Sequence, residues 1–200
     1  MAQNGGRFIV GGINQELIGN DTPVVIKFSP LANLYSMQAK ALHVGDLTIN
    51  LTDSDLGPMK VFIDSGATFT YFPARFYNQL AAHLINIGSS LNLLRFEDDK
   101  DICFKTPNGE PFSTLYNKFL NISFAFETGT IEWQPSDYLI NYRDATDTKC
   151  FGFMSYDRFL LGTSWLTGRY VHFDLQKMEV RVQQGRCSDE LKRVEKKLTT

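Results

Sequence analysis

One segment constrains this chain more than any other: Val61-Phe62-Ile63-Asp64-Ser65-Gly66-Ala67-Thr68-Phe69-Thr70. In it, an apolar, β-prone run delivers a carboxylate into a tight Ser-Gly turn that is flanked by hydroxyl side chains. Asp-Ser-Gly alone is a weak signal, because these common turn residues occur together in many unrelated chains. The surrounding sequence strengthens it: Pro73 opens a helical pattern, and a second apolar-Gly turn stands at Leu160-Leu161-Gly162.

A carboxylate held in such a turn is suited to work as one of a pair. Two aspartates forced close together cannot both ionise cheaply, so they share one proton; one acts as a base towards water while the other acts as an acid. Asp64 would be one of the two. Gly66 would let the backbone pass close beneath the carboxylate, where a Cβ would crowd the facing turn, and the Ser65 hydroxyl could reach an opposing turn.

This turn and three other segments resemble the second lobe of a pepsin-like aspartic protease, over the span from Gly6 to Cys187. Phe8–Asn14 is similar to the family's interlobe strand and Gly-Gly turn, and Tyr35–Gly45 to a strand pair that ends in Val-Gly. Leu160–Asp174 is similar to the closing segment, which has a Leu-Gly turn, a short helix and a strand ending in Phe-Asp. The resemblance implies an all-β fold with a few short helices, a single C-terminal lobe of the bilobal pepsin-like acid protease fold.

The resemblance also implies a function: hydrolysis of a polypeptide substrate by an aspartic endopeptidase that needs no metal or organic cofactor. It assigns the turn residues as follows: Asp64 is catalytic, Ser65 and Gly66 support the active-site turn, and Ala67, Thr68 and Phe69 form the cleft wall.

Two positions depart from the family pattern. Ala67 stands where relatives usually carry a Thr or Ser whose hydroxyl donates a hydrogen bond to the aspartate. Loss of a donor to the charged form favours the neutral form, so we expect activity at less acidic pH. The second departure is Thr163, which stands where an Asp is common after the Leu-Gly turn.

The chain has one Asp-Ser-Gly turn, whereas the mechanism needs two carboxylates. No other aspartate is followed by Ser-Gly or Thr-Gly, and Asp53-Ser54 continues to Asp55. A chain of 200 residues is also too short for both lobes. We therefore expect a missing N-terminal lobe with the second catalytic Asp, or a second copy of this lobe, as the small retroviral proteases pair. The alternative is a non-catalytic single lobe that binds peptides or a protein partner.

The three cysteines bear on the cellular compartment. By resemblance, Cys103 and Cys150 occupy the places where the family's second lobe carries its own disulfide. Cys187 is left over, which indicates a free thiol or a bond to another chain or to a missing segment. The other interpretation is three reduced, buried cysteines in a cytosolic protein.

Three glycosylation sequons favour the secretory route, beginning at Asn20, Asn50 and Asn121. We expect a secreted or lumenal (endomembrane or vacuolar) location as part of a longer protein. The opening residues 1–6 carry neither the charged nor the apolar region of a signal peptide. We therefore expect the full protein to begin further upstream.

Other function classes find little support in the sequence. A net charge of −2 gives no basic footprint for nucleic acid, and no apolar stretch is long enough to cross a bilayer. His43, His83 and His172 show no metal-ligand spacing, so we expect no metal site. Ser65 lies in no Gly-x-Ser-x-Gly elbow, which argues against serine hydrolysis.

The secondary structure expected from the pattern is mostly strand. Phe76, Leu80, Leu84 and Ile87 form one apolar stripe, which predicts a helix behind the turn that begins at Pro73 and ends before Gly88. Strands are predicted near residues 7–11, 23–28, 34–44, 60–63, 120–126 and 169–174. The domain expectation is a disordered start at 1–6, the lobe at 7–188 and a charged tail at 189–200.

Overall fold

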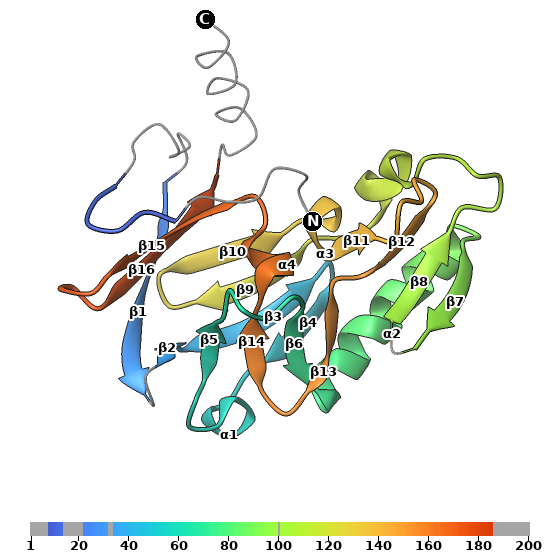
Figure 1. The fold of residues 1–200 in the computed structure, drawn as a ribbon. Coiled ribbons are helices and arrows are strands. Elements are labelled where there is room, and N and C mark those ends of the chain that lie inside the picture. Colours follow the sequence, from blue (N-terminus) through green and yellow to red (C-terminus); the bar gives the residue numbers. More distant parts are fainter. Residues whose placement is uncertain (1–7, 14–21, 32–33, 100, 186–200) are drawn as a thin grey trace, which may run out of the picture.

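The computed structural model describes residues 8–13, 22–31, 34–99 and 101–185 (Figure 1). Its strands are β1 (Val24–Leu31), β2 (Leu34–Met37), β3 (Ala39–Val44), β4 (Leu47–Asn50), β5 (Val61–Ile63), β6 (Thr70–Pro73), β7 (Leu94–Asp98), β8 (Asp101–Lys105), β9 (Ile122–Phe126), β10 (Gly129–Trp133), β11 (Leu139–Asn141), β12 (Thr148–Phe151), β13 (Phe153–Tyr156), β14 (Phe159–Leu161), β15 (Arg169–Asp174) and β16 (Glu179–Gln184). Its helices are α1 (Asp53–Leu56), α2 (Ala74–Ser90), the 3-10 helix η2 (Phe112–Lys118), α3 (Pro135–Tyr138) and α4 (Thr163–Leu166).

The strands form three sheets. The largest has eight strands in the order β13-β6-β14-β5-β2-β1-β16-β15, and the other two have the orders β10-β9-β3-β4 and β11-β12-β8-β7. In Figure 1, β3 and β9 cross behind the strands β5, β14 and β6. The predicted all-β class with a few short helices is confirmed, with α2 as the one long helix among the described residues.

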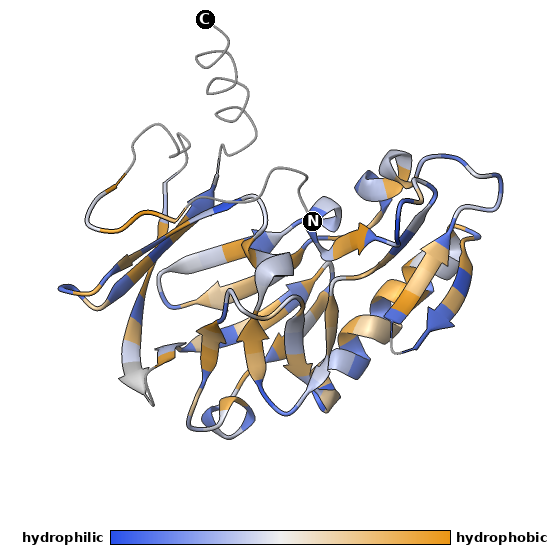
Figure 2. Cartoon of the chain, in the orientation of Figure 1, coloured by the Kyte–Doolittle hydropathy of each residue, from blue (hydrophilic) through white to orange (hydrophobic). Residues whose placement is uncertain are grey.

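Aromatic side chains fill the space between the eight-stranded sheet and the sheet β10-β9-β3-β4. Phe72 on β6 stacks against Phe124 on β9 with ring centroids 5.9 Å apart, and it meets Phe153 and Phe159 edge to face. All four side chains are buried. Aromatic pairs of this kind add about 1 kcal/mol each beyond the area they bury. In Figure 2, the neighbouring strands β5 and β14 carry the hydrophobic colour.

Helix α2 confirms the predicted stripe. Phe76, Leu80 and Leu84 are buried, and Ile87 packs partly buried against the same core. The helix lies against β6 and β13, and Phe76 contacts Phe159 with ring centroids 5.0 Å apart. Three residues at this spacing share one face because the helix has 3.6 residues per turn.

The predicted end of α2 is wrong, since the helix continues through Gly88 to Ser90. A Cβ built on Gly88 would lie 2.5 Å from Cε1 of Phe104, so this glycine allows close packing inside the helix. The change of direction comes at Asn92, whose φ of 56° is the left-handed conformation that often ends a helix.

Two of the strand predictions also need correction. Residues 8–10 have no regular structure, with Phe8 93% and Val10 82% exposed. A strand needs a partner for its backbone groups, and none of the described strands pairs with this segment. The predicted strand 34–44 is two strands, β2 in the eight-stranded sheet and β3 in a four-stranded sheet, with Gln38 between them.

The other predicted strands correspond to β1, β5, β9 and β15, with small differences at their ends. The predicted disordered start at 1–6 and charged tail at 189–200 lie outside the described residues. Among the described helices, none has the length and apolar character needed to cross a membrane.

Candidate active site

The strand arrangement brings the Asp64 turn and the Leu160-Leu161-Gly162 turn together. β14 lies between β5 and β6, parallel to the first, where Leu161 pairs with Ile63, and antiparallel to the second. Because β5 and β14 are parallel, their carboxyl ends meet at one edge of the sheet. The loop from β5 to β6, which carries Asp64, must therefore cross the end of β14.

Backbone hydrogen bonds fix the Asp64 carboxylate within this loop. The Asp64 amide donates to the carbonyl of Leu161 at 3.0 Å, and its carbonyl accepts from the Ala67 amide at 3.2 Å. The Gly66 amide donates to Oδ1 of the carboxylate at 2.8 Å. Asp64 is exposed and forms no ion pair with any described residue. Its second oxygen is therefore open to a partner from outside this part of the chain.

The first turn of α4 holds the same loop from its other side. The amides of Thr163 and Ser164 donate to the carbonyls of Ala67 and Thr68 at 2.7 and 3.0 Å. The Thr163 hydroxyl donates to the carbonyl of Ser65 at 3.2 Å. The first amides of a helix have no partner within it, so they are free to bind the loop.

A buried polar cluster joins α4 to the strands beneath it. The Ser164 hydroxyl donates to the carbonyl of Gly152 at 2.6 Å and lies 3.1 Å from the hydroxyl of Thr70. The indole of Trp133 donates to the Ser164 carbonyl at 3.2 Å. This cluster was not predicted from the sequence; its one local signal is the hydroxyl pair Thr163-Ser164 in an otherwise apolar stretch.

Arg169 anchors the other end of α4. Its guanidinium is buried, donates to the carbonyls of Trp165, Thr167 and Glu132, and lies 3.9 Å from Asp137. Burial lowers the pKa of Arg169 to about 10, although Asp137 opposes the shift. Burial likewise raises the pKa of Asp137, with Arg169 opposing. The helix that carries Thr163 and Ser164 is thus held at both ends.

The sequence match agrees with this geometry. Residues 34–184, more than half of the chain, match the family model described as xylanase inhibitor C-terminal, a C-terminal lobe of the pepsin-like aspartic protease type. The chain belongs to this family. The resemblance to a pepsin-like C-terminal lobe is confirmed.

Curated relatives point the same way. Plasmepsin V of Plasmodium falciparum (isolate 3D7) is 25% identical over 171 residues, which cover 68% of this chain and 28% of that protein. Aspartic proteinase 39 of Arabidopsis thaliana is 25% identical over 200 residues, which cover 95% of this chain and 39% of that protein. The chain therefore spans well under half the length of these relatives.

The turn residues assigned by resemblance lie together in this pepsin-like lobe. Their exposure differs along the turn, since Asp64, Ser65, Gly66 and Thr68 are exposed, whereas Ala67 and Phe69 are half-buried. Within the lobe, the space beside Gly66 is limited by the Asp64 carboxylate. A Cβ on Gly66 would meet Oδ1 of Asp64 at 3.1 Å, so it would crowd the carboxylate itself.

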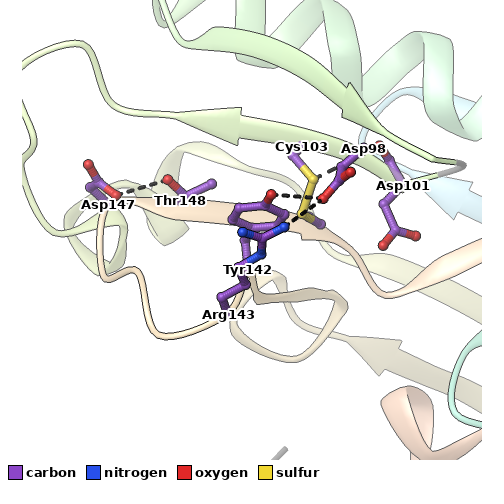
Figure 3. The surroundings of a disulfide bond; sticks show 8 residues. Asp98, Asp101, Cys103, Tyr142, Arg143, Asp147 and Thr148 are labelled. Atoms are coloured by element: carbon purple, nitrogen blue, oxygen red, sulfur yellow. Dashed lines mark hydrogen bonds and ion pairs between the residues drawn. A yellow bond between two sulfur atoms is a disulfide. The ribbon is translucent and has the colours of Figure 1, made fainter.

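The lobe contains the disulfide implied by the resemblance (Figure 3). Cys103 on β8 and Cys150 on β12 are directly opposite in register, and a bond joins their sulfur atoms. Beside it, the Tyr142 hydroxyl donates to Asp98 at 2.8 Å. Because the disulfide closes a separation of 47 residues, it constrains the unfolded chain strongly. Cys187 lies outside the described residues.

The sequons differ in their surroundings. Asn20 lies outside the described residues, and Asn50 is exposed at the end of β4. Asn121 is half-buried, and its amide donates to Glu132 at 2.9 Å. Within the described ranges, no cluster of three or more His, Cys, Asp or Glu side chains could hold a metal ion.

Proposed function

We propose that this lobe is the C-terminal half of an aspartic endopeptidase. Asp64 pairs with an aspartate of an N-terminal lobe; one carboxyl group takes a proton from water while the other gives a proton to the peptide carbonyl. The observation that carries the proposal is the exposed Asp64 carboxylate, oriented by the Gly66 amide on a turn held by α4. Ala67, Thr68 and Phe69 would border the bound polypeptide.

The partner in this proposal is a missing N-terminal lobe. The relatives named above are much longer than this chain, which leaves room for such a lobe. The exposed apolar segment 8–13 supports it further, since Phe8 and Val10 lack burial within this lobe. A second copy of this lobe is the alternative partner.

We also propose a secreted or lumenal location within a longer protein. The buried Cys103–Cys150 disulfide supports this, because disulfides persist in oxidising compartments. In such a compartment, Asn20, Asn50 and Asn121 could carry glycans, and Cys187 could bond to a missing segment.

A second candidate is a non-catalytic lobe that binds a peptide or protein. The description of the matching family, a xylanase inhibitor domain, favours it. The presence of one Asp-Ser-Gly turn in this chain is compatible with it as well.

Peptide cleavage separates these functions. The purified chain is assayed from acidic to neutral pH, alone and with a pepsin-like N-terminal lobe supplied, beside an Asp64→Asn variant and with its solution mass measured. Activity that needs the supplied lobe and falls at least about a thousandfold in the variant supports the proposal. Cleavage by a dimer of the chain alone supports pairing of two copies. Tight peptide binding without cleavage, both by the chain alone and with the N-terminal lobe supplied, favours the non-catalytic lobe and overturns the protease assignment.

A further inference from the structure

We propose that Thr163 is a positioning residue for the catalytic turn, an inference that rests on the proposed function of Asp64. The residue is exposed and opens α4 directly after Gly162. Its hydroxyl donates to the carbonyl of Ser65 at 3.2 Å, and its amide donates to the carbonyl of Ala67 at 2.7 Å. One residue thus binds the turn on both sides of Gly66.

The turn needs this support because its own hydrogen bonds are short-range and exposed. The amides of Gly66 and Ala67 both bond back to Asp64. Water competes for such bonds at the surface, so each contributes only modest net stability. The tether from Thr163 comes from a helix whose Trp165 is fully buried and whose last carbonyls are held by Arg169. It therefore connects the turn to a buried, hydrogen-bonded part of the lobe.

The chemistry of the tether is specific to a hydroxyl. A threonine oxygen can donate to a carbonyl, whereas the ionised aspartate that is common at this position in the family only accepts. An aspartate at 163 would face the Ser65 carbonyl as a second acceptor and would bring a negative charge towards Asp64. The threonine instead closes the turn without adding a charge there.

Amide hydrogen exchange at Gly66 and Ala67 tests the tether in the 200-residue chain itself. Thr163→Val keeps the side-chain shape and removes the hydroxyl, so both amides should exchange about fivefold faster. Thr163→Asp should behave like Thr163→Val, and Thr163→Ser should restore the slow exchange.

Thr114→Val is the matched control. Thr114 is also exposed, and its hydroxyl donates to a backbone carbonyl, that of Pro111, at 3.0 Å on the 3-10 helix η2. This variant should leave the exchange of Gly66 and Ala67 unchanged. Equal exchange in wild type and Thr163→Val would overturn the proposal. A uniform rise across the core strands in Thr163→Val, or a failure of Thr163→Ser to restore slow exchange, would do the same.

The complete two-lobe enzyme supplies a second readout. There, Thr163→Val should lower kcat with KM nearly unchanged, and Thr163→Ser should restore kcat. A fall in kcat that the serine does not restore would overturn the positioning role. If the wild-type enzyme cleaves nothing, the proposed function fails, while the exchange measurement still decides whether Thr163 holds the turn.

Discussion

Gly162 lies directly against the backbone of Phe69. A Cβ built on Gly162 would stand 2.0 Å from the carbonyl oxygen of Phe69 and 2.7 Å from that of Ala67. Both contacts are with backbone, which cannot rotate away as a side chain can. The absence of a side chain at Gly162 is therefore what allows the loop carrying Asp64 to cross the end of β14.

Gly162→Ala should destabilise the lobe by about 3 kcal/mol, because the loop or α4 must move to admit the methyl group. Chemical denaturation followed by circular dichroism measures this. Gly12→Ala is the control, since a Cβ there meets no atom of the described residues within 4 Å, and it should change the free energy of unfolding by less than about 0.5 kcal/mol. Equal stability of the two variants would contradict the steric argument.

Under the proposed function, Asp64→Asn should remove peptide cleavage by the two-lobe enzyme without loss of stability. The side chain is exposed, and the asparagine carbonyl oxygen can still accept the Gly66 amide. We expect the free energy of unfolding to stay within about 0.5 kcal/mol of the wild type in urea titration. A larger loss would mean that the carboxylate has a structural role, and the variant would then be unsuitable as the inactive control.

Asp137 should make stability depend on pH. Burial raises the pKa of Asp137 above its usual value of 3.8. A carboxyl whose pKa is higher in the folded chain gives stability that is fully present below the unfolded pKa and lost as pH rises through the folded pKa. Asp137→Asn, which stays neutral, should therefore gain stability relative to the wild type as pH rises through that window, as measured by Tm between about pH 3 and pH 7.

Asp174→Asn is the control with the opposite sign. The pKa of Asp174 is lowered, chiefly because its carboxylate accepts the Lys177 amide at 3.0 Å. Its contribution is present above the unfolded pKa and lost as pH falls through the folded pKa. The Asp174→Asn variant should thus lose stability relative to the wild type as pH rises. The same pH trend in both variants would refute the assignment to Asp137.

Removal of the disulfide should cost roughly 4 kcal/mol in the chain-entropy model for a loop of this size. A Cys103→Ala, Cys150→Ala double variant tests it by urea denaturation, in comparison with the oxidised wild type. The wild type measured in reductant should unfold at the same urea concentration as the variant once its buried sulfurs are reduced. A loss below about 1 kcal/mol would indicate that the sheet β11-β12-β8-β7 holds this loop closed without the bond.

Two tyrosines test the value of a buried hydroxyl. Tyr138 is fully buried, its hydroxyl donates to the Leu120 carbonyl at 2.7 Å, and burial raises its pKa, which keeps the proton in place. Tyr138→Phe should cost about 1 kcal/mol. Tyr142→Phe removes an exposed bond to Asp98 and should cost less than about 0.5 kcal/mol by urea denaturation. The reverse ranking would show that the Leu120 bond adds little.

Several elements could be predicted because their signals are local. The stripe Phe76, Leu80 and Leu84 repeats at the helical period, and α2 forms there. The end of α2 was predicted too early because a glycine after an apolar stripe usually indicates a helix end. Gly88 instead lies inside the helix, where its lack of a side chain leaves room for Phe104. The strand predicted at 7–11 failed for a related reason: an apolar run becomes a strand only where another strand pairs with it.

The candidate site likewise has a part that local sequence predicts and a part that depends on long-range contacts. The Asp64 turn could be identified from its own ten residues, since turn chemistry is local. The bonds that hold it could not, because Thr163 and Ser65 are 98 residues apart, and Ser164 and Thr70 are 94 apart. Nor did any local pattern mark Arg169 and Asp137 as a buried pair.

By itself, the sequence determined the family, the mostly β class, the Asp64 turn and the long helix, since each of these depends on residues that are contiguous in the chain. The tertiary structure alone decided that β14 passes between β5 and β6 and that Gly162 leaves room for the loop of Asp64. It also decided that the first turn of α4 forms hydrogen bonds to that loop. The physical reason is that these contacts join segments about a hundred residues apart. Their free energy is realised only once the topology of the sheet has brought those segments together.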